Sequence, residues 1–380
     1  MNLNELRLEI DKIDNELVSL FEQRMSVAAQ IADYKQANNL PVFDPKRERE
    51  KLHDIASKLP EELQEYGYAL YSLIFELSRS SQTRIMNKSG DTSAKIKKAL
   101  EETAPMLPFS PTVACQGVEG AYSQLACERV FTNPEILYFS SFEDVFTAIE
   151  NGQCRYGVIP LENSTAGSVN KVYDLMQKHS FSIVRSTRIK VDHNLLVNPG
   201  VRLEDIKEIY SHEQAIGQCS EFLKSLDGVQ VIACENTAAA AKMVAESGRK
   251  DIAAISSRAC TRLYGLECLR PSIQNQGNNH TRFICISKEL EIYPGADRTS
   301  LMMILPHTPG SLYKVLSRFY ALGMNLNKLE SRPIPERDFE FMFYFDIEVP
   351  VYSPNFLQLM DELGNISEKF SYLGSYSEVI

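Results

Sequence analysis

The sequence predicts a multidomain chain of three architectures: an all-α N-terminal domain, a two-lobed α/β domain and an α+β, ferredoxin-like C-terminal domain. Residues 1–86 are helical in pattern, and residues 112–287 alternate β-rich runs with helical stretches. After residue 293 the pattern follows a βαββαβ order. A length of 380 residues agrees with two or three domains, each able to build its own core.

The N-terminal domain, at residues 1–90, is expected to contain one long helix and two shorter ones. The first runs from about Leu3 to Ala37 without Pro or Gly, and the second follows Pro45. The third follows Pro60 and carries one apolar face: Leu63, Tyr66, Leu70, Ile74 and Leu77. Because this arrangement leaves too little partner surface within one chain, we expect an intertwined helical dimer.

Residues 91–110 are predicted to be a linker with room for a short helix. The α/β domain is placed at residues 111–288. Its β-rich runs are 113–117, 156–160, 181–186, 207–212, 229–234, 252–257 and 282–287. Helical stretches between these runs indicate a parallel or mixed sheet, divided between two lobes.

The C-terminal domain is placed at residues 297–380. Strands are expected at 300–306, 325–333, 338–349 and 370–379, with helices at 309–323 and 354–364. Its modest size suggests an accessory or regulatory module rather than the seat of the chemistry.

Composition excludes several classes of protein. No apolar run approaches the roughly 18 residues that a membrane span needs, and the charged N-terminus argues against a signal peptide. The eight cysteines are scattered and the six histidines isolated, which favours reduced thiols in the cytoplasm and no metal site. A net charge of −10 disfavours binding to nucleic acid or to an acidic membrane, although a pocket for a small anion remains compatible with it.

Two cations lie on the face of the first helix that should be buried. At 100° per residue, Arg24 and Lys35 share a face with Leu6, Ile10, Ile13, Leu17, Leu20, Ala28 and Ile31. Buried cations need partners, so they either pair with internal carboxylates, reach solvent at the helix ends, or surround a small polyanion such as a dicarboxylate. Several further charged groups could face the same cavity: Asp44, Arg47, Glu48 and, across a dimer, Arg7.

With these positions, residues 1–86 resemble the all-helical chorismate mutase domain, which is an intertwined dimer. The family's residue types stand at Arg7, Arg24, Lys35, Asp44, Arg47, Glu48, Ser78 and Gln82. The resemblance implies that Arg24 and the other subunit's Arg7 bind the two carboxylates of chorismate. It also implies that Lys35 and Gln82 contact the ether oxygen and that Glu48 contacts the ring hydroxyl.

Four joints between strands and helices in the α/β domain carry polar or glycine-rich sequences. They are Gly117, Gly120 and Ser123; Asn163, Ser164 and Thr165; Ser211 with Gln214 at a capping-box spacing; and Thr237. One such joint is commonplace. Four of them in two lobes favour a cleft for an anion, because helix N-termini offer free N–H groups.

The series PLENSTAGS, VDHNLL, YSHEQA, NTAAA and NNHTRF resembles prephenate dehydratase, a two-lobed enzyme with its active site between the lobes. The resemblance implies that Thr281 assists loss of the ring hydroxyl. It implies roles in the cleft for Asn163, Ser164, Thr165, Gln214 and Arg282, and no metal or organic cofactor. His193 and His212 are candidates for the proton donor, although structural or positioning roles are favoured. The loop CQGVEGAYS also resembles plant arogenate dehydratases, which leaves arogenate open as a substrate.

The C-terminal segments HTPGSLYKVL and LESRPIPERDFEF resemble the ACT regulatory domain. The matching residues are Gly310, Ser311, Leu312, Glu330, Ser331, Arg332 and Pro333. The implied ligand is L-phenylalanine, bound between two ACT domains as an end-product inhibitor; the alternative is a domain that only dimerises.

Nearly the whole chain therefore resembles the bifunctional chorismate mutase–prephenate dehydratases. The expected activity is conversion of chorismate to prephenate and then to phenylpyruvate, by a cytoplasmic homodimer or higher homo-oligomer. Two alternatives are arogenate as the preferred dehydratase substrate and a non-catalytic sensor of aromatic ligands.

Overall fold

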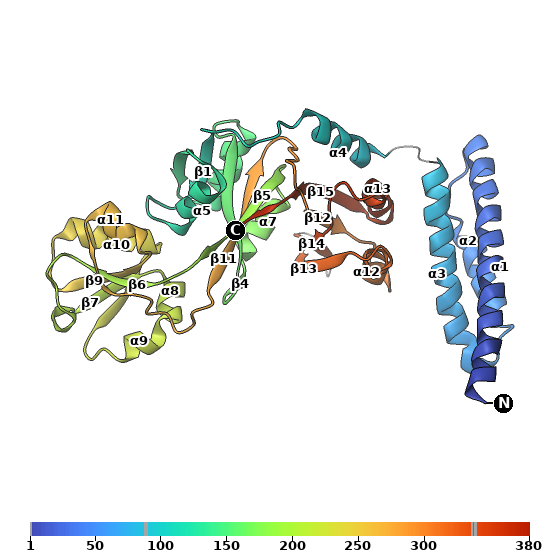
Figure 1. The fold of residues 1–380 in the computed structure, drawn as a ribbon, viewed down its shortest axis with the longest axis horizontal. Coiled ribbons are helices and arrows are strands. Elements are labelled where there is room, and N and C mark those ends of the chain that lie inside the picture. Colours follow the sequence, from blue (N-terminus) through green and yellow to red (C-terminus); the bar gives the residue numbers. More distant parts are fainter. Residues whose placement is uncertain (1, 87–89, 336, 338–339) are drawn as a thin grey trace. The chain divides into compact units, whose positions relative to one another are not determined.

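The computed structural model describes residues 2–86, 90–335, 337 and 340–380. Contacts divide the chain into two compact units, Met1–Ala94 with Leu357–Ile366, and Lys95–Phe356 with Ser367–Ile380. Figure 1 shows the helices and strands of both units.

The first unit is built on a long helix and its companions. Helices α1 (Leu3–Ala37), α2 (Pro45–Ala56) and α3 (Glu61–Met86) confirm the three predicted helices, and α1 and α2 both pack against α3. Asn2 starts α1 with a capping box, in which its side chain accepts from the N–H of Glu5 and the Glu5 carboxylate accepts from the N–H of Asn2. Pro45 at the start of α2 follows the Asp44 cap.

The same unit includes most of α13 (Phe356–Ile366) and the start of α4 (Asp91–Glu102). Asp361 of α13 accepts hydrogen bonds from the backbone N–H groups of Gly90 and Ser93, at 3.1 and 3.2 Å. A carboxylate at this position satisfies free N–H groups and the positive end of the helix dipole. The segment expected to be a linker therefore contains a capped helix.

The second unit contains sheet A, a mixed sheet ordered β16-β5-β11-β3-β1-β2, with β4 pairing β3. Its central strands β3 and β11 pair in antiparallel, and most residues of these two strands are buried. The strands are β1 (Thr112–Gln116), β2 (Glu135–Phe139), β3 (Tyr156–Asn163), β4 (Gly167–Ser168), β5 (Ser182–Lys190), β11 (His280–Ser287) and β16 (Glu378–Val379). The associated helices are α5 (Tyr122–Val130), α6 (Phe142–Glu150) and α7 (Asn170–Met176).

Sheet B follows the order β10-β6-β9-β7-β8 and is joined to sheet A by two segments, 191–193 and 271–279. Its strands are β6 (Asn194–Val197), β7 (Glu208–Ser211), β8 (Gln230–Ala233), β9 (Ile252–Ser256) and β10 (Glu267–Arg270). Its helices are η1 (Leu203–Asp205), α8 (Glu213–Gln218), α9 (Ser220–Lys224), α10 (Thr237–Ser247) and α11 (Ala259–Tyr264).

Sheet C is antiparallel, in the order β13-β14-β12-β15. Strands β12 (Arg298–Ile304), β13 (Asn325–Pro333), β14 (Phe341–Glu348) and β15 (Lys369–Tyr376), with α12 (Ser311–Ala321) and α13, follow the predicted βαββαβ order. Asp338 and Phe339, at the start of the predicted third strand, lie outside the described residues.

Sheets A and C share one apolar core. Ile183 of β5 is buried in the same cluster as Met302, Tyr344 and Tyr376 of sheet C. The rings of Tyr173 in α7 and Tyr344 in β14 meet edge to face, with centroids 5.2 Å apart. The shared core packs β12, β14 and β15 against β3, β5 and α7. Polar side chains of β13 contact Ser168 of β4.

Candidate active sites

Arg24 lies on the inward face of α1, together with the buried Ala28 and Ala32. Its guanidinium donates to Ser78 Oγ of α3 and lies 5.3 Å from the centre of the Phe75 ring. Burial lowers the pKa of Arg24, which is the expected effect of removing water from a cation. Among the described residues no carboxylate forms an ion pair with Arg24. Glu48 acts on it through its charge alone, and a hydroxyl and an aromatic face hold the guanidinium in place.

Other predicted residues of the helical site lie between α1, α2 and α3. Lys35 Nζ donates to the carbonyl of Val42 at 2.5 Å, and Asp44 accepts from the N–H of Arg47 at 3.0 Å as the cap of α2. Glu48 forms an ion pair with Arg79, a residue that sequence reasoning missed although it follows the predicted Ser78.

Gln82 is buried, and its Oε1 has no hydrogen-bond partner among the described residues. An orphaned buried amide oxygen is costly unless a ligand or water satisfies it. Arg7 and Arg47 are exposed and do not join this cluster within the single chain.

The second site is a cavity of about 520 Å³ between strands of sheet A and helix starts of sheet B. Five residues singled out in the sequence line it: Asn163, His193, His212, Gln214 and Thr281. So do Gly117, Ser123 and Thr237 from the predicted joints. Gly117 and Gly120 have φ of +112° and +89°, which confirms the tight turn, and a Cβ on Gly120 would lie 2.8 Å from Cys260 Sγ.

The predicted caps at this cavity need correction. His212 rather than Ser211 caps α8, because its Nδ1 accepts from the N–H of Gln214 at 3.3 Å, while Ser211 Oγ donates to the buried carbonyl of Ile255. Asn236 rather than Thr237 caps α10. Asn163, Ser164 and Thr165 end β3 and form a turn into β4; they do not begin a helix.

Hydrogen bonds fix the orientation of Asn163. Its Oδ1 accepts from the backbone N–H groups of Thr165 and Ala166 at 3.0 and 2.9 Å, and because N–H groups only donate, this atom must be the oxygen. Nδ2 then donates to Thr281 Oγ1 at 2.9 Å and to Asn279 Oδ1 at 2.7 Å. Thr281 is therefore the acceptor in this bond, and no described residue accepts its hydroxyl hydrogen.

The same chain of bonds sets the tautomer of His193. Asn279 Nδ2 donates to Gln218 Oε1 at 2.9 Å, so His193 Nε2, 2.8 Å from that oxygen, must carry a hydrogen. His193 is 3% exposed, and burial lowers its pKa, which favours the neutral ring at neutral pH. Its Nδ1 then carries a lone pair with no partner in the described residues. In this state His193 can accept a hydrogen bond at Nδ1 but cannot donate one there.

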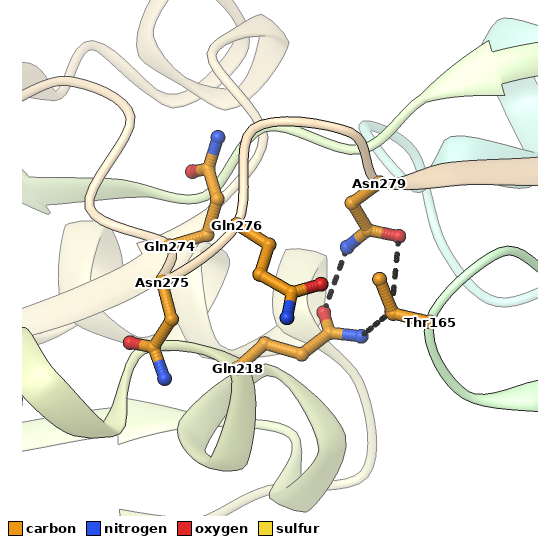
Figure 2. Close-up of a pocket in the computed structure, with 6 residues that line it drawn as sticks. All are labelled: Thr165, Gln218, Gln274, Asn275, Gln276 and Asn279. Atoms are coloured by element: carbon orange, nitrogen blue, oxygen red, sulfur yellow. Dashed lines mark hydrogen bonds between the residues drawn. The ribbon is translucent and has the colours of Figure 1, made fainter.

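A smaller cavity of about 200 Å³ adjoins this network and is lined by amides and one hydroxyl. Figure 2 shows Gln218, Asn279 and Thr165 turned toward one another, with Gln274, Asn275 and Gln276 on the segment that returns from sheet B. Gln218 Nε2 donates to Thr165 Oγ1 at 2.9 Å, so this network joins sheet A to sheet B. Of the amide side chains in this network and its cavity, Asn163 alone was predicted as a site residue.

Ser164 and Arg282 do not line the cavity of Thr281. Ser164 Oγ donates to the carbonyl of Asn278 at 2.9 Å. Arg282 follows Thr281 in β11, so its side chain points to the opposite face of the strand. It is 5% exposed, forms an ion pair with Asp346 of β14 and donates to Tyr376 Oη at 3.0 Å. The expected place of Arg282 in the cleft is therefore corrected: it ties β11 to sheet C.

The residues predicted to bind phenylalanine fall into two groups. Gly310 starts α12 with φ +82°, followed by Ser311 and the half-buried Leu312. On β13, Glu330 accepts from Ser168 Oγ at 2.5 Å, and Arg332 pairs with Asp174 of α7 through two bonds of 2.9 and 3.0 Å. Ser331 and Pro333 alternate with them and are exposed.

Among the described residues, no group of three or more His, Cys, Asp or Glu side chains is placed to hold a metal ion. Within the same residues, every helix is too short or too polar to cross a membrane.

The fold and the two sites define the class of the chain. It is a helical module with half-buried cations, fused to an α/β module with a polar cavity of the kind that enzymes use for small molecules. Residues 6–83 match the family model of chorismate mutase type II, and residues 113–291 match that of prephenate dehydratase.

Known proteins share this domain combination. A bifunctional chorismate mutase/prephenate dehydratase of Enterobacter agglomerans is 32% identical over 379 residues, covering 98% of this chain and 95% of the relative. An arogenate dehydratase/prephenate dehydratase of Arabidopsis thaliana is 37% identical over 281 residues, covering 70% and 71%. The crystal structure of prephenate dehydratase from Arthrobacter aurescens in complex with L-Phe is 27% identical with a TM-score of 0.64, covering 70% of this chain and 90% of that one. The chain belongs to the family of bifunctional chorismate mutase/prephenate dehydratases.

Proposed function

We propose that the chain catalyses two successive steps of phenylalanine biosynthesis, from chorismate to prephenate in the helical domain and from prephenate to phenylpyruvate in the cavity at Thr281. Beyond family membership, the observation that carries the second step is the direction of the bond between Asn163 and Thr281. It leaves the Thr281 hydroxyl hydrogen available to a substrate.

In the mutase step, Arg24 and the Arg7 of a second copy bind the two carboxylates of chorismate. Lys35 and Gln82 contact the ether oxygen, and Glu48 contacts the ring hydroxyl. The reaction is pericyclic and needs no proton transfer, so the protein acts by holding the compact conformer and stabilising charge on the breaking C–O bond. An ether oxygen only accepts, so Gln82 donates to it through Nε2, with the amide turned so that Nε2 takes the place of the unpartnered Oε1. Ser78, Asp44 and Arg47 hold Arg24 and the start of α2.

A dimer of the helical domain completes this site. Five apolar residues that share one face of α1 are 44–60% exposed within the single chain: Leu6, Ile10, Ile13, Leu17 and Leu20. A second copy would cover this face and could bring its Arg7 to Arg24. We therefore propose an intertwined homodimer or a higher homo-oligomer.

In the dehydratase step, the bond between the ring and the departing carboxylate breaks. Its electron pair enters the ring, the C–O bond to the ring hydroxyl breaks, and the hydroxyl leaves as water after taking up one proton. Thr281 donates a hydrogen bond to that hydroxyl as charge develops on it. Asn163, Thr165 and Gln214 position Thr281 and the substrate, and Ser164 secures the turn. Aromatisation provides a large driving force, so modest acid assistance suffices.

Arogenate is a second candidate substrate for the same cavity. Two observations favour it: Gly117 of the loop CQGVEGAYS lines the cavity, and the Arabidopsis relative is named for both substrates. Arogenate differs from prephenate by an amino group in place of the keto oxygen of the side chain. The choice between them therefore depends on contacts to that group rather than on Thr281.

For residues 297–380 we propose an ACT regulatory domain that binds L-phenylalanine between two copies, through Gly310–Leu312 and Glu330–Pro333. The βαββαβ order and the Arthrobacter complex with L-Phe support this. The proposed domain boundaries are 1–90, 111–288 and 297–380, with 91–110 as the connecting segment. The free, scattered cysteines support a cytoplasmic location.

The direct test gives the purified protein chorismate, prephenate or arogenate. Loss of chorismate and appearance of phenylpyruvate are the expected results, while faster turnover of arogenate to phenylalanine would favour the second candidate. A protein that turns over none of the three would instead be a sensor of aromatic ligands.

A further inference from the structure

One side chain of sheet C contacts both strands of the hairpin that carries Asn163. Lys328 Nζ on β13 is 3.1 Å from Glu162 Oε2 on β3 and donates to Ser168 Oγ on β4 at 2.8 Å. Glu162 and Ser168 are paired across the hairpin, and the next pair is Asn163 with Gly167. Lys328 therefore holds the hairpin at the pair next to the turn of residues 163–167.

These contacts are partly shielded from water. The side chains of Lys328 and Glu162 are 19% and 28% exposed, so the ion pair is stronger than one on an open surface. Glu330 also accepts from Ser168 and lies 3.4 Å from Lys328 Nζ. Burial opposes ionisation of Glu162, but Lys328 and Arg282 outweigh it and lower the pKa of its carboxyl.

Glu162 also connects the two strands that carry Asn163 and Thr281. Arg282, the neighbour of Thr281, lies 3.4 Å from Glu162 Oε1 and pairs with Asp346 of sheet C. A single carboxylate on β3 thus accepts one cation from β13 and one from β11. The turn between β3 and β4 supplies the Thr165 and Ala166 N–H groups that fix Asn163.

We propose that Lys328 is a positioning residue of the dehydratase site. By holding Glu162 and Ser168 together, it fixes the turn after Asn163 and so keeps the Asn163 amide directed at Thr281. Sheet C contributes to the dehydratase reaction through this contact even when the domain binds no ligand. The inference rests on the proposed dehydratase function.

The test compares Lys328→Met with Lys328→Arg and with the control Lys369→Met. Methionine removes the charge and keeps most of the length, arginine restores the charge, and Lys369 is an exposed lysine of the same sheet with no ion pair among the described contacts. Loss of turn geometry is expected to lower kcat for prephenate roughly 10- to 100-fold in Lys328→Met, with a smaller change in KM. Lys328→Arg should recover most of the rate, and Lys369→Met should match wild type.

Two further measurements distinguish a positioning role of Lys328 from a general loss of folded protein. Mutase turnover of chorismate by the same preparation should be unchanged in all three variants. Hydrogen exchange of the Thr165 and Ala166 amides should accelerate in Lys328→Met only, because their acceptor Asn163 Oδ1 would no longer be held. If Lys328→Met does not fold, Glu162→Gln, which keeps the shape of the side chain, takes its place with the same expectations.

A Lys328→Met protein with wild-type kcat for prephenate and unchanged exchange at Thr165 and Ala166 would overturn the proposal. Equal loss in Lys328→Met and Lys328→Arg would overturn it as well, since charge would then not matter. Failure of the dehydratase function itself is recognised separately, as a wild-type protein that does not turn over prephenate.

Discussion

Asn163 and Thr281 lie 118 positions apart in the chain, and the amide of the first donates to the hydroxyl of the second at 2.9 Å. Backbone N–H groups on the other side of Asn163 leave its amide only this orientation. The turn after β3 therefore makes the Thr281 hydroxyl an acceptor toward Asn163. The hydrogen of the Thr281 hydroxyl is left to donate to a substrate.

Thr281→Ala is expected to lower prephenate turnover by on the order of 100-fold or more, because it removes a donor directed at the leaving hydroxyl. Turnover of chorismate should be unchanged, since that site lies in the helical domain. Thr281→Ser, which keeps the hydroxyl, is the matched control and should retain most of the activity. Parallel loss of both activities in Thr281→Ala would contradict separate sites.

Asn163→Asp tests the direction of the same bond. An ionised carboxylate can still accept from the N–H groups of Thr165 and Ala166, but it cannot donate to Thr281. The Thr281 hydroxyl would then turn its hydrogen toward residue 163, and kcat for prephenate should fall while the fold is kept. Steady-state kinetics together with thermal unfolding check this; full activity in Asn163→Asp would refute the assigned direction.

Arg24→Leu is expected to abolish mutase turnover while leaving the helical domain as stable as before or more stable. The reason is that burial lowers the pKa of Arg24 more than the charge of Glu48 raises it, and no described carboxylate forms an ion pair with the guanidinium. The measurements are chorismate turnover and thermal unfolding, with Arg49→Leu on the exposed face of α2 as control. An unfolded Arg24→Leu protein would favour a purely structural role.

His193 makes stability depend on pH. Its pKa is lowered in the folded protein, so below the unfolded-state value of about 6.5 the unfolded chain binds the proton more readily. The stabilising contribution is present above that pH and is lost as pH falls through the folded-state pKa. Between about pH 7.5 and about pH 5.5, wild type should therefore lose more unfolding free energy than His193→Gln, which keeps a donor toward Gln218. Urea unfolding at the two pH values measures the difference; equal losses would show that His193 is not responsible.

L-Phenylalanine is expected to raise the melting temperature of the wild-type protein and to inhibit its dehydratase activity. Gly310→Ala should weaken both effects, because alanine at φ +82° costs roughly 1 kcal/mol and shifts the backbone at the start of α12. Gly295→Ala is a matched control, since Gly295 also has φ +82° and open space around it. Equal responses of the two variants to phenylalanine would argue against a site at Gly310.

The long helices and the order of elements in the C-terminal domain could be predicted from the sequence. The bounds of α1 agree with the absence of Pro and Gly between Leu3 and Ala37, and the C-terminal βαββαβ order was visible as alternating strand and helix patterns. Strand β2 was missed, and so were β6 and β10, although the equally short β7 and β8 were predicted. Strands β7 and β8 carry adjacent β-branched or aromatic residues, Ile209–Tyr210 and Val231–Ile232, and neither β6 nor β10 has such a pair.

The candidate sites were predictable only in part. Thr281 and Asn163 were found through the family pattern, but their bond depends on the pairing of β3 with β11, which no local pattern encodes. The prediction that Arg282 lies in the cleft with Thr281 was wrong. Neighbouring residues of a strand point to opposite faces, so the sequence already contained the information to exclude it. Asn279 stands in the quoted motif NNHTRF but was not singled out there, and Gln218 gave no signal, because isolated amides occur throughout any soluble sequence.

Strand β16 is the last element of the C-terminal domain in sequence, yet Glu378 and Val379 pair in parallel with Ser186 and Thr187 at the edge of sheet A. The C-terminal domain therefore cannot be exchanged for that of a relative without changing the edge of sheet A. A chimera that takes residues 297–380 from a relative would import a foreign edge strand into the dehydratase sheet. Recombination that exchanges regulatory properties should place its second crossover before Glu378, so that β5 and β16 keep a common parent.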